Sequence, residues 1–158
     1  TAPSTMRLSL AEGQAAVRQF VVPPGPSQVI GLEVYTTSIA NAPACARFKL
    51  VVWLPDANGV FADGASWESE REALLNEAQV AQLVAADEGA PLLAPGPVRA
   101  GLAYLGPCAG TSFNPWIALD QTGDTSDSFV WAGNWIPGSS LGLSGRWALR
   151  LVVGDGLP

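Results

Sequence analysis

Short apolar segments, most of them closed by Gly, Pro, Asn or Asp, recur along the whole chain. In two of them, 30–35 (Ile-Gly-Leu-Glu-Val-Tyr) and 147–152 (Trp-Ala-Leu-Arg-Leu-Val), the alternation is sharpest. A period of two residues places one face of a strand in a core and the other in solvent. The pattern predicts strands at 6–10, 16–22, 29–36, 47–54, 98–105, 116–119, 128–131 and 146–153.

These strands predict an all-β protein, with two antiparallel sheets packed as a β-sandwich. No internal repeat and no shift in composition marks a domain boundary, so the interpretation is a single domain over 1–158. Residues 1–13 are mostly polar or small and are expected to form an extended N-terminal arm.

The segment after residue 68 is ambiguous. Ser69-Glu70-Arg71-Glu72 has the form of a helix capping box, and Gly89 could end the helix. However, the apolar residues of 73–86 do not form one helical stripe. A helix near 70–86 and a strand, a turn and a strand both remain open.

Asp56-Ala57-Asn58-Gly59 separates the predicted strand at 47–54 from Val60-Phe61. It predicts a hairpin turn in which Asn58 or Gly59 takes a positive φ.

The chain is unusually poor in charge. Of its 158 residues, 48% are hydrophobic and only 14% are charged, whereas charged residues normally take about a quarter of a soluble domain. Part of the apolar surface is therefore expected to be covered by a neighbour, in a homo-oligomer or a larger complex. No apolar run approaches the ~20 residues needed to span a bilayer, so membrane insertion is not expected.

The net charge of −6, with Lys49 as the single lysine, leaves no basic stripe. Binding to nucleic acid depends on cations that neutralise phosphates. The sequence therefore predicts no nucleic-acid partner.

Cys45 and Cys108 are the two cysteines, and turn-forming residues flank both. They are predicted to form a disulfide, with two buried thiols as the alternative. A disulfide indicates an oxidising compartment, and hence an extracellular or periplasmic protein. The chain begins at Thr1, which fits either a mature product after removal of a signal peptide or a shortened chain.

The sequence contains no His. Catalytic arrangements that use Ser, His and Asp or Cys and His are therefore excluded, and a zinc site is not expected. The chain is interpreted as a non-enzyme without a cofactor. One acidic segment, with Asp120, Asp124 and Asp127, leaves three alternatives open: a polar loop, a Ca²⁺ site and a carboxylate pair for glycoside hydrolysis.

The six Trp residues carry the strongest binding signal. Trp131 and Trp135 flank Asn134, directly after the acidic segment, so one indole could project from a turn and stack on a sugar ring. The predicted ligand-binding residues are Trp131, Asn134, Trp135, Asp124 and Trp67. In the alternative, both Trp131 and Trp135 fill the open end of the sandwich.

Four segments carry a family resemblance: 20–25 (Phe-Val-Val-Pro-Pro-Gly), 29–35 (Val-Ile-Gly-Leu-Glu-Val-Tyr), 99–104 (Arg-Ala-Gly-Leu-Ala-Tyr) and 145–150 (Gly-Arg-Trp-Ala-Leu-Arg). Their arrangement resembles the secreted galactose-binding-like jelly rolls. In those domains a Gly-x-x-Tyr strand crosses the middle of a sheet, and the closing strand follows a Gly-Xaa-Trp step. The resemblance implies a jelly-roll sandwich, in a family with carbohydrate-binding, adhesive and purely structural members.

Two functions follow as expectations. The first is a non-catalytic extracellular module that binds a carbohydrate or another polar ligand through loop aromatics. The second is a structural subunit of a filament, a capsid or another complex, held by apolar surfaces and an N-terminal strand that pairs with a protein partner.

Overall fold

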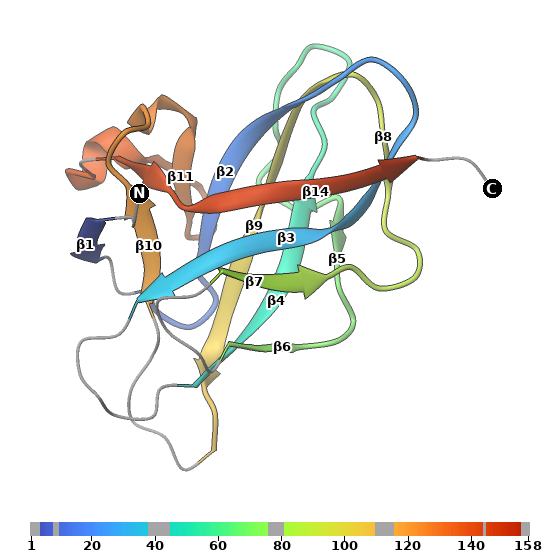
Figure 1. Ribbon diagram of the computed structural model, residues 1–158. Helices are drawn as coiled ribbons and strands as arrows, with labels where there is room; N and C mark the ends of the chain where they lie inside the picture. Colours follow the sequence, from blue (N-terminus) through green and yellow to red (C-terminus); the bar gives the residue numbers. More distant parts are fainter. Residues whose placement is uncertain are drawn as a thin grey trace.

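The computed structural model describes residues 4–7, 10–37, 45–75, 81–109, 116–143 and 145–155, which form two antiparallel sheets packed face to face (Figure 1). In this view β3 and β14 cross in front of β2, β9 and β4. The first sheet contains β1 (Ser4–Arg7), β3 (Ser27–Thr37), β7 (Ala81–Ala85), β8 (Leu92–Leu93), β10 (Trp116–Asp120), β13 (Arg146–Trp147) and β14 (Leu149–Asp155). The predicted all-β sandwich is confirmed.

The second sheet has the order β12-β11-β2-β9-β4-β5, and β6 also pairs with β4. Its strands are β2 (Ala15–Val22), β4 (Ala46–Trp53), β5 (Trp67–Glu68), β6 (Ala73–Leu75), β9 (Gly96–Pro107), β11 (Ser128–Trp131) and β12 (Trp135–Pro137). Two short 3-10 helices, η1 (Thr125–Asp127) and η2 (Gly138–Leu141), flank β11 and β12.

Of the two alternatives for residues 70–86, the helix is wrong, because the described part of this segment forms two strands. Ala73–Leu75 forms β6, which pairs with β4 in the second sheet, and Ala81–Ala85 forms β7, which pairs with β3 in the first. The two strands therefore belong to opposite layers rather than to one hairpin. Residues 76–80 between them lie outside the described part of the chain.

The turn at 56–59 forms as predicted, and Gly59 has a φ of +76°. The Asp56 carboxylate accepts hydrogen bonds from the backbone N–H groups of Asn58 and Val60, at 2.8 and 2.9 Å. The predicted hairpin does not form, because Val60 and Phe61 are not in a strand that pairs with β4. β4 pairs instead with β5, so residues 54–66 form a long connecting loop.

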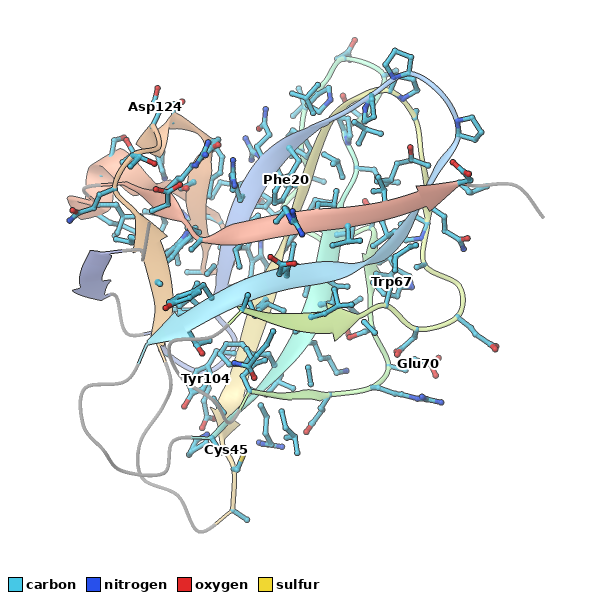
Figure 2. All side chains as sticks on the ribbon, in the orientation of Figure 1. Phe20, Cys45, Trp67, Glu70, Tyr104 and Asp124 are labelled. Carbon is cyan, nitrogen blue, oxygen red and sulfur yellow. A yellow bond between two sulfur atoms is a disulfide. The ribbon has the colours of Figure 1, made fainter. Side chains whose placement is uncertain are left out.

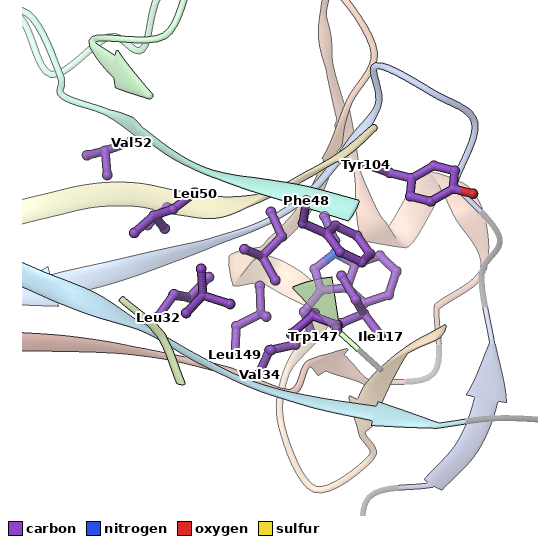
Figure 3. Packing of buried hydrophobic residues seen from close by; sticks show 14 of the residues in the cluster. Leu32, Val34, Phe48, Leu50, Val52, Tyr104, Ile117, Trp147 and Leu149 are labelled. Atoms are coloured by element: carbon purple, nitrogen blue, oxygen red, sulfur yellow. The ribbon is translucent and has the colours of Figure 1, made fainter. Parts of the chain in front are cut away.

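The main core lies between the sheets. Figure 3 shows Leu32, Val34 and Leu149 of the first sheet facing Phe48, Leu50 and Val52 of the second. Trp147 is fully buried among them. Its indole N–H donates a 2.9 Å hydrogen bond to the backbone oxygen of Phe129 on β11, so this side chain links the two layers.

Gly101 lies in the middle of β9, between Val17 of β2 and Val51 of β4. A Cβ atom at this position would collide with the backbone oxygen of Ala16 and lie 2.8 Å from the Cα of Val17. A side chain therefore has no space here, and β2 packs closely against β9.

The predicted disulfide is confirmed. Cys45 precedes β4 and Cys108 follows β9, with their Cα atoms 5.3 Å apart. The Cys108 N–H also donates to the Cys45 carbonyl oxygen at 3.0 Å. The bond thus joins neighbouring strands at one end of the second sheet, and it favours an oxidising environment.

Two further expectations concern the N-terminal arm and membrane insertion. Within the segment expected to form an arm, Ser4–Arg7 pairs with β10 of the same chain.

In the part of the chain that the structure describes, no helix is long and apolar enough to cross a membrane.

Candidate functional site

A second apolar cluster lies on the outer face of the second sheet. Ala16, Val52 and Val130 point into the main core, so their chain neighbours point away from it. The outer face of a sandwich normally carries polar residues. Here it carries five aromatic side chains, which we call the outer aromatic cluster: Trp53, Phe61, Phe129, Trp131 and Trp135.

The rings of this cluster pack edge to face or at a tilt. The ring centroids of Trp53 and Trp135 lie 4.9 Å apart at 69°, and those of Phe129 and Trp135 lie 5.9 Å apart at 79°. Trp131 packs at a tilt against Trp53, with 6.0 Å between the centroids. Such pairs are favourable beyond the area they bury, because the positive ring edge meets a negative face.

The loop at 54–66 packs against part of the cluster. The indole N–H groups of the three Trp residues in the cluster hold this loop in place. Trp131 and Trp53 both donate to the backbone oxygen of Asp63, at 2.7 and 3.4 Å, and Trp135 donates to that of Ala62 at 3.2 Å. The three indoles therefore have a fixed orientation. Their N–H groups are already used, so stacking on the rings is the interaction they can offer a ligand.

Arg99 of β9 lies among these rings. Its guanidinium carbon is 4.0, 4.2 and 4.5 Å from the ring centroids of Phe129, Phe61 and Trp135. The Nε–H donates to the side-chain oxygen of Gln19 at 3.1 Å. Burial lowers the pKa of Arg99 from its usual value, because it disfavours the charged form.

The structure brings Trp131 and Trp135 together and separates the other predicted binding residues from them. These two Trp residues face each other across the β11–β12 pair, partly exposed, and Asn134 is exposed in the turn between them. Trp67 packs instead against the main core. Asp124 accepts a hydrogen bond from the Ser126 N–H and caps η1. Figure 2 places Trp67 and Asp124 far apart.

Phe61, Phe129 and Arg99 were not predicted from the sequence as members of this site. Two runs carried the missing signal, Val51-Val52-Trp53 and Phe129-Val130-Trp131. An uninterrupted apolar run predicts a strand that is covered on both faces. Both runs therefore indicate that something packs on the outside of the second sheet.

The acidic segment is engaged in its own contacts. Asp120 accepts hydrogen bonds from the hydroxyl and N–H of Thr122, at 2.6 and 3.0 Å, and lies 3.4 Å from the Arg146 Nε. The hydroxyl of Thr122 is the main cause that lowers the pKa of Asp120. Asp127 pairs with Arg18 at 3.1 Å. No group of three or more Cys, Asp or Glu that could hold a metal ion occurs in the described ranges.

A groove of about 900 Å³ opens between β6 and β7, lined by residues 70–75 and 82–89. Its lining includes the acidic residues Glu70, Glu72, Asp87 and Glu88. Asp87 accepts a 2.9 Å hydrogen bond from the Arg71 N–H across it. Figure 2 shows Glu70 beside this region.

Comparisons with protein-family models, with curated proteins and with solved structures found no match. The two-sheet antiparallel sandwich is consistent with the general jelly-roll resemblance of the sequence.

Proposed function

We propose that this protein is a secreted, non-catalytic β-sandwich module that binds a carbohydrate or another polar ligand on the outer aromatic cluster. One observation carries the proposal: five aromatic side chains lie on the sheet face turned away from the main core, and Trp131 and Trp135 among them are partly exposed. Aromatic planes are surfaces on which sugar rings stack. The galactose-binding-like resemblance points in the same direction.

The site is preorganised. The indole N–H groups of Trp131 and Trp135 are tied to the loop at 62–63, and the rings pack against one another. A ligand that stacks on them therefore costs little further side-chain entropy. Exposed Asn134 lies between the two indoles in sequence and can offer an amide donor and acceptor to a hydroxyl group.

The disulfide supports the secreted part of the proposal. Structural disulfides persist outside the reducing cytosol. The Cys45–Cys108 bond joins the ends of β4 and β9, which pair with each other in the second sheet. It is therefore a structural disulfide.

The binding test is a titration of Trp fluorescence with a panel of oligosaccharides. We expect a panel member to change the emission of the wild-type protein, and we expect Trp131→Ala to weaken its binding at least about tenfold. Asn134→Ala removes an exposed side chain and tests the same site with little effect on packing. It should also weaken binding.

The matched control is Trp67→Ala, because Trp67 is also partly buried but packs against the main core. Its affinity should stay within about twofold of the wild type, with folding of every variant checked by circular dichroism. No response to the whole panel, or an equal loss in Trp67→Ala, would contradict the proposal.

A second function, as a subunit of an assembly, is favoured by the edges of the two sheets. In the described residues, β6 pairs only with β4 and β7 only with β3. Leu74 and Leu83 on these strands are 59% and 56% exposed. Unpaired strand edges beside exposed leucines are templates for pairing with another chain.

Size-exclusion chromatography with light scattering tests this second function. A subunit of a homo-oligomer should elute as a stable multimer at micromolar concentration, and Leu74→Lys with Leu83→Lys should dissociate it. The matched control is Val21→Lys, because Val21 is 81% exposed but lies on β2. A wild-type monomer would overturn self-assembly through these edges.

A further inference from the structure

Arg99 is a partly buried cation that pairs with no carboxylate among the residues that the structure describes. Five other basic side chains pair with a carboxylate at 2.8–3.7 Å: Arg18, Arg47, Lys49, Arg146 and Arg150. Among the basic side chains whose surroundings the structure describes, only Arg71 and Arg99 lack such a pair, and Arg71 is exposed. The chain has 14 acidic residues, so the missing partner does not reflect a shortage of carboxylates.

The two terminal nitrogens of Arg99 are still available. Its Nε is bonded to Gln19, but no described residue accepts a hydrogen bond from Nη1 or Nη2. Neither is among the buried polar atoms that lack a partner, so both retain contact with solvent. The terminal nitrogens therefore keep hydrogen-bonding capacity toward solvent, although three rings pack against the guanidinium.

The surroundings leave part of the cost of burying this charge uncompensated. Three aromatic rings stabilise the cation through their π faces. Within the described ranges, its one hydrogen-bond acceptor is the neutral amide of Gln19. A carboxylate would bind such a group strongly, because a guanidinium fork matches its two oxygens with parallel, charge-assisted hydrogen bonds.

We propose that Arg99 binds the carboxylate of an acidic sugar that stacks on the outer aromatic cluster. This inference rests on the proposed carbohydrate-binding function and names its ligand class. Stacking and charge recognition come from one site, because Arg99 contacts the rings of Phe61, Phe129 and Trp135 directly. The net charge of −6 repels polyanions in general, so binding of an acidic glycan has to come from a local feature.

The test compares oligogalacturonate with its methyl ester of the same length, using calorimetry on the wild-type protein. The ester keeps the sugar ring but removes the charge. We expect oligogalacturonate to bind at least about tenfold more tightly at low salt, with the difference shrinking as salt is added. This comparison needs no variant.

Variants then locate the effect. Arg99→Met keeps an apolar stem among the rings and should bind the acid and the ester equally. Arg99→Lys keeps the charge but not the fork, and should retain only part of the preference. Arg150→Met is the matched control, because Arg150 is exposed on the first sheet and pairs with Glu33; it should keep the full preference.

The outcomes separate the two proposals. Equal binding of the acid and the ester by the wild type would overturn the role of Arg99 and leave the proposed function standing. Binding of neither would count against the proposed function itself. Equally tight binding of a sulfated oligosaccharide that carries no carboxylate would overturn the assignment of a carboxylate ligand.

Discussion

Removal of the Cys45–Cys108 disulfide is expected to lower the free energy of unfolding by about 4 kcal/mol. The two cysteines are 63 positions apart, so the bond closes a long loop and restricts the unfolded chain. For a domain of this size the loss corresponds to a fall in Tm of roughly 8–16 °C. Thermal unfolding followed by circular dichroism, with and without reductant and on the Cys45→Ser/Cys108→Ser variant, measures it.

Strand content at room temperature should survive the reduction, because the core between the sheets does not depend on the disulfide. Thiol titration of the denatured, unreduced protein is the control and should find no free thiol. Two titratable thiols in freshly isolated protein would contradict both the disulfide and the oxidising compartment inferred from it.

Trp147→Ala is expected to cost about 3–5 kcal/mol of unfolding free energy. Trp147 is fully buried between the sheets, so truncation leaves a large cavity. The variant also removes the indole N–H that bonds the Phe129 carbonyl. Chemical denaturation measures this loss: the midpoint should fall, while the dependence of the unfolding free energy on denaturant concentration (the m-value) stays equal to that of the wild type.

Two further variants separate the contributions. Trp147→Phe keeps a buried aromatic ring but removes the indole donor to the Phe129 carbonyl, and should cost about 1–3 kcal/mol. Arg150→Ala removes an exposed ion pair with Glu33 and should change stability by less than about 1 kcal/mol. A cost below about 1 kcal/mol for Trp147→Ala would contradict the position of Trp147 in the core.

The sequence predicted the long strands well because their alternation is local. The prediction at 128–131 coincides with β11, and those at 16–22 and 47–54 are within one residue of β2 and β4 at each end. The strand predicted at 146–153 divides at Ala148, since β13 pairs with β10 and β14 with β3. β5, β8 and β12 are only two or three residues long and too short to show a period.

The sequence also predicted part of the candidate site. Trp131 and Trp135 are four positions apart around a turn, so their pairing across β11 and β12 needs only a tight hairpin. Trp67, Phe61 and Arg99 could not be placed in this way. Their positions depend on which strands pair and on where the loop at 54–66 folds back, both of which are decided by contacts between distant parts of the chain.

By itself, then, the sequence determined the all-β class, the main strands and the pair of cysteines, because turn residues, a two-residue period and cysteine chemistry act locally. Only the tertiary structure decided that β6 and β7 belong to opposite sheets. It also decided that an aromatic cluster lies on the outer face of the second sheet, with Arg99 against three of its rings. Those arrangements arise from packing between segments that are far apart in the chain, which no local pattern of residues specifies.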